Sequence, residues 1–242
     1  LLLARKRLDI SQLERAHEIS GYLLSVVGTL YAVLLGLVVV DAMQKFQQAR
    51  DVVEREANSL ADVYVFAGRL PAQKRDAVQS VCRKYAHEVI SGEWPAMDKG
   101  SYSPEARRTA VKLMEAVSDF EPTTENEKAL YPMIVQNASE VWDNRRIRIN
   151  MATNGVPLVE WITLIIGAEI VVIFTYFFDL KHLKLQIMMT AMVAALIALN
   201  LYLLLLFGYP FSGELSIHAD AFNIDESIFE NRVSTAKNAS VQ

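Results

Sequence analysis

Side chains that carry out enzyme chemistry are few and scattered in this chain. The four histidines lie far apart and none belongs to a metal-ligand pattern such as His-x-x-x-His; they are His17, His87, His182 and His218. The single cysteine, Cys82, falls inside an amphipathic helical pattern, where a small buried apolar role is more typical than a nucleophilic one. Neither a glycine-rich phosphate loop nor a Gly-x-Ser-x-Gly motif is present. An enzyme is therefore the least supported class, and we expect no cofactor and no metal site.

Two polar side chains lie near the middle of largely apolar segments. Glu169 lies near the middle of the apolar stretch Val156–Phe178, and Asn200 lies near the middle of the next one, Leu185–Phe207. An ionised carboxylate at mid-bilayer costs several kcal/mol. We therefore expect Glu169 to turn away from lipid, with Asn200 as its partner. It is either an ion- or proton-sensing group or a hydrogen-bonded structural carboxyl.

Three arginines precede the first of these apolar segments. Arg145, Arg146 and Arg148 could contact lipid phosphates or attract anions near a vestibule. A solvated or salt-bridged helix end explains the same residues equally well. Trp94, in the sequence Glu93-Trp94-Pro95, is either a packing anchor or part of a binding surface, and we favour packing.

The element that must position these residues is the stretch Gly21–Asp41. The 19 residues from Tyr22 to Val40 carry no charge, and as a helix they would be about 28 Å long, close to the thickness of the hydrocarbon core of a bilayer. We predict a membrane span. Small residues recur on one stripe of this helix at steps of three or four, which lets another helix approach closely in lipid; they are Gly21, Ser25, Gly28, Ala32 and Gly36. This packing could occur within one subunit or between subunits around an axis.

Composition requires a polar part beside the apolar spans. Apolar residues make up 52% of the 242 residues and charged residues make up 21%. This share of charged residues is too high for a protein made only of membrane spans. No region is basic enough to indicate nucleic-acid binding. We divide the chain into 1–3, the end of a further N-terminal span; 4–18, a connector; 19–42, the central span; 43–154, a helical extramembrane domain; 155–208, a transmembrane hairpin; and 209–242, an acidic tail. A signal-peptide remnant is the alternative for the first residues.

The region 43–154 is predicted to consist of four helices with short loops. Apolar residues at three- and four-residue steps continue the central span as one long helix to about Arg69. Ser103 is expected to cap a helix that begins at Pro104, and Thr124 with Glu127 matches a capping box. We predict a loop from Ser91 to Tyr102 and an irregular tail after Phe211.

Several short sequences, taken in order, resemble a bacterial family of unassigned function that is described as bestrophin-like. They are Tyr31-Ala32-Val33-Leu34-Leu35-Gly36, Glu56-Ala57-Asn58-Ser59-Leu60, Glu93-Trp94-Pro95, Arg145-Arg146 and Pro210-Phe211-Ser212-Gly213. The resemblance covers nearly the whole chain. A more distant similarity to bestrophins lies in Lys45-Phe46-Gln47-Gln48-Ala49-Arg50, which is similar to the pattern Arg-Trp-Trp-Glu-Ala-Arg but departs from it at Phe46 and Gln47.

The resemblance implies an all-α membrane protein with four spans per subunit, the first mostly missing here, and a cytosolic helical region between spans two and three. It also implies a pentameric anion channel. Aligning Lys45–Arg50 with the bestrophin pattern places the residues that line the pore at Thr29, Val33 and Leu37, which share one helix face. A register shifted by one residue would place Tyr22, Val26, Leu30 and Leu34 there instead.

Two functional classes follow from these observations. The first is an oligomeric bestrophin-like ion channel or pore, anion-conducting, lined by the helix of residues 21–41, in a bacterial inner membrane. Its partners are the lipid bilayer, further copies of itself and inorganic ions. The second is a membrane-anchored interaction or regulatory protein without conduction. Positive charges near the membrane are equal in number on the two sides, six each, so a cytosolic 43–154 region rests on the resemblance.

Overall fold

In a computed structural model of the chain, the structure describes residues 10–176 and 183–239. The expected end of an N-terminal span at 1–3 and the first residues of the 4–18 connector lie outside these ranges. The described chain forms two compact units. Unit 1 comprises residues 1–45 and 156–208, and unit 2 comprises residues 46–155 and 209–242. In the described ranges all regular structure is helical, as the sequence predicts.

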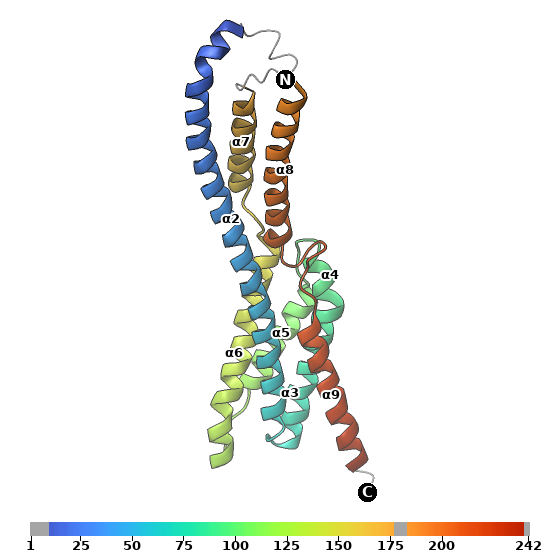
Figure 1. Cartoon of the computed structure of the whole chain (residues 1–242). Coiled ribbons are helices and arrows are strands. Elements are labelled where there is room, and N and C mark those ends of the chain that lie inside the picture. The colour runs from blue at the N-terminus through green and yellow to red at the C-terminus, as the bar shows by residue number, and fades with distance from the viewer. Residues whose placement is uncertain (1–9, 177–182, 240–242) are drawn as a thin grey trace. The chain divides into compact units, whose positions relative to one another are not determined.

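Unit 1 is built from three apolar helices (Figure 1). They are the first part of α2 (Ile10–Ala67), α7 (Leu158–Thr175) and α8 (Leu183–Gly208). Three described helical segments are long and apolar enough to cross a membrane; they are Gly21–Ala67, Glu125–Thr175, whose apolar part is α7, and Leu183–Gly208. The three long apolar helices that the sequence predicts in these regions are therefore present.

The long helix α2 contributes to both units. Its 58 residues contain no proline, and it ends at Ala67, directly before Gly68 and a turn that leads to Pro71. Proline and glycine end helices because proline lacks the backbone N–H and glycine loses more backbone entropy. The predicted continuation of the central span to about Arg69 is confirmed to within two residues.

Unit 2 is a bundle whose helices begin where the sequence offers caps. Its other helices are α3 (Ala72–Glu88), the π-helix η1 (Val89–Glu93), α4 (Trp94–Met97), α5 (Pro104–Ser118), α6 (Glu125–Thr153) and α9 (Asp220–Ala239). The Ser103 hydroxyl accepts a hydrogen bond from the Ala106 N–H, 3.2 Å away, at the start of α5. Thr124 and Glu127 form the reciprocal capping box at the start of α6. Both predicted caps are confirmed.

Two predictions for unit 2 are wrong. The expected loop from Ser91 to Tyr102 is largely helical, because α3 runs on through η1 into α4. The expected irregular tail contains the 20-residue helix α9. Phe222 and Phe229 of this helix are buried, so an apolar stripe at seven-residue spacing stabilises a helix whose overall composition is polar.

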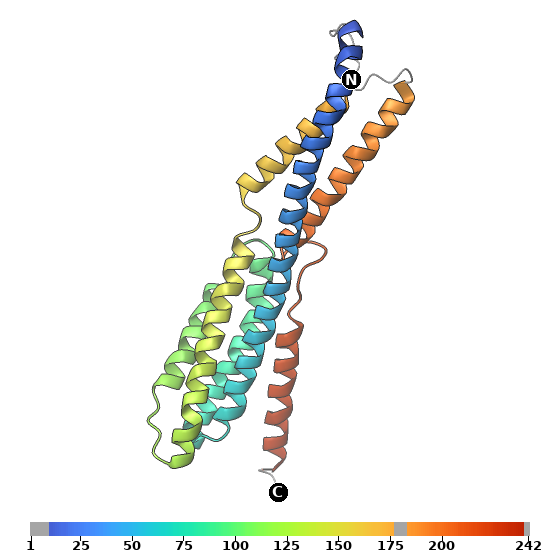
Figure 2. The same cartoon turned by 60° about the vertical axis from the view of Figure 1, so that its left-hand side comes forward.

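The core of unit 2 lies between α2, α3, α5, α6 and α9. Figure 2 shows α6 and α9 on opposite sides of the pair α2 and α3, and Figure 1 gives the same order. Fully buried members include Leu60, Val78, Tyr85 and Leu113. Charged side chains are also buried in this unit, at the level of η1.

Candidate functional site

One face of α2 packs inside unit 1. Tyr31 and Leu35 are buried, with Val39 and Ala42, against Leu164 and other residues of α7 and α8. The Tyr31 hydroxyl donates a hydrogen bond to the Leu164 carbonyl oxygen, 3.1 Å away. A methyl group on Gly167 would collide with the Tyr31 ring, so glycine is required for this approach of α7 to α2.

The opposite face of α2 carries the residues that the resemblance places on a pore. Val33 is 57% exposed and Leu37 is 65% exposed within the subunit. Thr29 is also exposed, and its hydroxyl donates to the Ser25 carbonyl oxygen on its own helix. The alternative register is exposed as well, with Tyr22, Val26, Leu30 and Leu34. Exposure is therefore consistent with either register.

Among the described residues, nothing fills the small-residue stripe of α2. A methyl group added to Gly28 or Gly36 would meet no described atom within 4 Å. Ser25 and Ala32 are exposed, and Gly21 is half-buried. Both explanations, packing by a further part of the same subunit and packing between subunits, fit a stripe that is open among the described residues.

The polar pair expected in the hairpin does not form within the described subunit. The Asn200 amide donates to the Leu196 carbonyl oxygen one turn earlier, 2.9 Å away, because a short polar side chain in an apolar helix readily returns to its own backbone. Glu169 is exposed beside a groove of about 350 Å³ between α7 and α8. The expectation that Asn200 is its partner is therefore wrong. That Glu169 avoids lipid stays a prediction.

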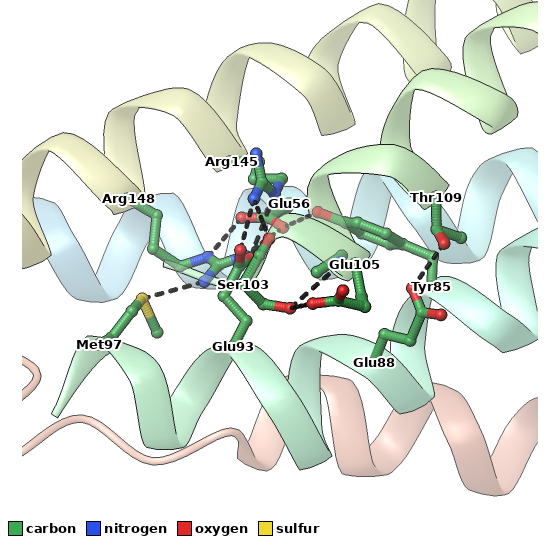
Figure 3. Close-up of polar contacts among 11 residues, drawn as sticks. Glu56, Tyr85, Glu88, Glu93, Met97, Ser103, Glu105, Thr109, Arg145 and Arg148 are labelled. Atoms are coloured by element: carbon green, nitrogen blue, oxygen red, sulfur yellow. Dashed lines mark hydrogen bonds and ion pairs between the residues drawn. The ribbon is translucent and has the colours of Figure 1, made fainter. Parts of the chain in front are cut away.

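Unit 2 holds a buried cluster of four charged side chains, shown in Figure 3. The Arg148 guanidinium donates to Glu56 from Nε at 2.7 Å and from Nη2 at 2.8 Å, and Nη2 also donates to Glu93 Oε2 at 2.8 Å. Arg145 pairs with both oxygens of Glu93. Glu56, Glu93 and Arg148 are fully buried. Two arginines and two carboxylates balance in charge, as burial requires.

Neutral groups complete this cluster. The Tyr85 hydroxyl donates to Glu56 Oε1 at 2.5 Å. The Arg148 guanidinium carbon lies 5.1 Å from the centroid of the Trp94 ring and 5.8 Å from that of Phe222, within cation–π range. The Trp94 indole N–H donates to the Ile217 carbonyl oxygen at 2.9 Å. Trp94 is therefore a packing anchor, the alternative that the sequence favours.

The protonation states within the cluster follow from its surroundings. Burial would lower the pKa of the Arg148 guanidinium, but the neighbouring Glu56 and Glu93 carboxylates outweigh burial and hold that pKa well above its ordinary value. Burial, with the charge of Glu56, raises the pKa of the Tyr85 phenol well above its ordinary value. Arg148 therefore stays charged, and Tyr85 stays a neutral donor.

The cluster corrects the interpretation of the three arginines. Arg145 and Arg148 do not contact lipid or free anions in this arrangement, because both guanidinium groups are buried and paired. The pair lies three residues apart and shares the inner face of α6, whereas Arg146 points to a different face. Arg146 is exposed beside an open groove of about 830 Å³ that Arg107 also lines. Of these three arginines, Arg146 alone remains a candidate for anion or lipid contact.

Sequence reasoning missed the acidic partners, although a signal was present. Glu56 lies between Val53, Ala57 and Leu60, which are all buried on one stripe of α2. A carboxylate at a core position of an amphipathic helix indicates a buried ion pair. Glu93 could not be placed in this way, because a π-helix turn directs it inward and a period of 3.6 residues does not describe that turn.

Metal chemistry has no support in the described part of the chain. No group of three or more histidine, cysteine, aspartate or glutamate side chains is arranged there to hold a metal ion. The two candidate sites are thus the exposed face of α2 in unit 1 and the buried cluster in unit 2.

Comparison with known proteins identifies a family and a fold. The sequence model of the protein family described as Bestrophin-like domain matches residues 1–222. None of the curated proteins compared matches the chain.

Three solved structures are similar to the chain over nearly its whole length. A single-residue variant of a bacterial bestrophin homolog from Klebsiella pneumoniae gives a TM-score of 0.68 at 13% identity and covers 90% of this chain and 91% of its own. The same homolog solved with zinc phasing gives 0.67 at 14%, with 90% and 91% covered. A variant described only as a membrane protein gives 0.69 at 12%, with 90% of each chain covered. At these identities the likeness concerns the fold.

Proposed function

This chain belongs to the bestrophin-like family, and we propose that it assembles into a homo-oligomeric, anion-conducting pore lined by the 21–41 segment of α2. We propose five copies around the axis, four spans in each subunit, and a bacterial inner membrane as the location. The extramembrane region 43–154 then lies in the cytosol.

One observation carries this proposal: among the described residues, α2 packs inside its subunit through only one face. Its Tyr31 face packs on α7 and α8, while the faces of Val33 and Leu37 and of Gly28 and Gly36 are left open. A ring of inner helices needs two such faces, one toward the axis and one toward the neighbouring helix. The two open faces lie roughly 100° apart at 3.6 residues per turn.

The chemistry of the proposed lining is that of an apolar gate. Rings of Val33 and Leu37 would form a constriction that stops ions by dewetting, with Thr29 as a polar ring beside it. Such a constriction does not select by charge. The preference for anions would then come from cationic side chains outside the span, of which the exposed Arg146 and Arg107 are candidates.

The test is ion flux from vesicles that contain the purified protein, with the mass of the assembly measured in parallel. Chloride efflux that exceeds potassium efflux, from an assembly of several copies, is the expected result. A stable oligomer that conducts neither ion would favour the alternative of a membrane-anchored interaction or regulatory protein. Cation-selective flux would support a pore but would contradict the proposal that the pore conducts anions.

A further inference from the structure

Helix α9 carries a carboxylic acid on its buried face. Asp225 lies between Phe222 and Phe229 on this face and is only 5% exposed. Its Oδ2 atom is buried and has no hydrogen-bond partner among the described residues. A buried carboxylate without a donor is costly, because an ionised group loses its hydration and gains nothing in return.

The groups that face Asp225 from α2 do not compensate a negative charge. Asp62 is close enough to act on it as a second negative charge. The Tyr64 hydroxyl donates instead to the Phe229 carbonyl oxygen, at 3.3 Å, while the two rings stack with centroids 4.1 Å apart. From η1, Glu93 is held by the two buried arginines.

The groups on α3 are also engaged elsewhere. Arg83 donates to the Tyr64 hydroxyl at 3.4 Å. The Cys82 thiol is fully buried near Asp225, and burial raises its pKa, so it remains neutral. His87 Nδ1 lies 3.2 Å from Glu226 Oε1, and this contact is an ion pair only when the imidazole is protonated. Burial and the charge of Asp62 together raise the pKa of Asp225 to about 7.

We propose that a single proton controls how tightly α9 packs on α2 and α3: the helix packs tightly when the Asp225 carboxyl is protonated, and it packs more weakly, so that the released state is more populated, when that carboxyl is ionised. The proposal does not depend on conduction.

The direction of the pH effect follows from the difference in proton affinity of Asp225 between the packed and the released state. The packed state binds the Asp225 proton more tightly than the released state does, so packing is unaffected below the ordinary aspartate pKa. It weakens as pH rises toward 7 and levels off above that value. Between pH 6 and pH 8 the packing equilibrium should fall by about tenfold.

Release of α9 would also change the surroundings of the buried cluster in unit 2. Phe222 of α9 lies over Arg148 and packs edge-to-face on Trp94, with ring centroids 5.8 Å apart. Removing Phe222 would expose one side of Arg148, whose ion pairs join α2, η1 and α6. A proton at Asp225 is thus linked to the packing of the whole unit.

Amide hydrogen exchange on the full chain in detergent tests the proposal. The protection factors of residues 222–230, corrected for intrinsic exchange, should fall by about tenfold from pH 6 to pH 8 in the wild type. In Asp225→Asn they should be constant within about twofold, because the amide cannot ionise. Glu230→Gln replaces an exposed carboxylate on the same helix and should retain the wild-type slope, as should His87→Gln. A flat wild-type profile, or an unchanged slope in Asp225→Asn, would overturn the proposal.

A second variant keeps the test decisive if Asp225→Asn fails to fold. Asp62→Asn leaves Asp225 in place and removes the like charge beside it, so the midpoint of the exchange profile should move to lower pH. The labelling rate of Cys82 gives an independent readout of α9 release when the rate in the wild type is compared with the rate in Asp62→Asn at each pH. A midpoint that does not move in Asp62→Asn contradicts the proposal.

Discussion

Arg148 makes the largest set of contacts in the buried cluster, and its removal should therefore be costly. Arg148→Met keeps an unbranched apolar stem but removes the guanidinium group, which leaves Glu56 and part of Glu93 buried without a counter-charge. We expect a loss of about 3–5 kcal/mol in the free energy of unfolding, as found when one partner of a buried ion pair is removed.

The matched control is Arg146→Met, because Arg146 is an exposed neighbour on the same helix. Its unfolding free energy should stay within about 0.5 kcal/mol of the wild type. Denaturant unfolding in detergent, followed by circular dichroism, measures both variants. Equal stabilities would show that the cluster does not hold unit 2 together.

The Glu127 carboxylate should make the start of α6 sensitive to acid. Hydrogen bonds from the Thr123 and Thr124 backbone N–H groups lower the pKa of Glu127 below its ordinary value. The stabilisation is therefore complete above the ordinary glutamate pKa and is lost as pH falls through the lowered pKa. Corrected amide exchange at residues 124–128 should rise in acid in the wild type. Glu127→Gln should show the faster exchange already at neutral pH, whereas Glu125→Gln should resemble the wild type.

At the scale of helices, two kinds of glycine in unit 1 should respond differently to substitution. Gly167→Ala places a methyl group against the Tyr31 ring, so we expect lower stability of the subunit itself. A Cβ added at Gly28 or Gly36 meets no described atom within 4 Å, so with Gly28→Leu and Gly36→Leu we expect the subunit to stay folded while the assembly dissociates. Size-exclusion chromatography with light scattering, together with thermal unfolding, separates the two effects. Intact assemblies in both Leu variants would show that the small-residue stripe is not part of the subunit interface.

The helices that could be predicted were those with local signals. Ser103 and Thr124 mark helix starts through their own side chains, and the uncharged run from Tyr22 to Val40 marks a span by length alone. Helix α9 could not be predicted in this way, since its few apolar residues gain their stability by packing on α2 and α3. Glu93 was missed for a related reason, because its inward direction depends on a π-turn that the sequence period does not contain.

At the scale of the whole molecule, the orientation of unit 2 needs a reporter other than the native cysteine. Cys82 is fully buried, so a failure to label it would not distinguish the two sides of the membrane. Ser101→Cys in a Cys82→Ala background places a thiol at an exposed position of the same unit. An impermeant thiol reagent should leave it unlabelled in intact spheroplasts and label it after lysis. Labelling before lysis would contradict a cytosolic location.

The central claim is that Val33 and Leu37 of α2 line a conducting pore, and single-channel conductance in planar bilayers tests it most directly. Val33→Ala combined with Leu37→Ala should widen the apolar constriction and raise the conductance or open probability while the mass of the assembly stays unchanged. The matched control is Ile162→Ala with Ile166→Ala, two apolar residues of α7 at the same four-residue spacing and similarly exposed, which should conduct as the wild type does. Wild-type conductance in the Val33/Leu37 double variant, or a conductance change of equal size in the α7 control, would contradict the account.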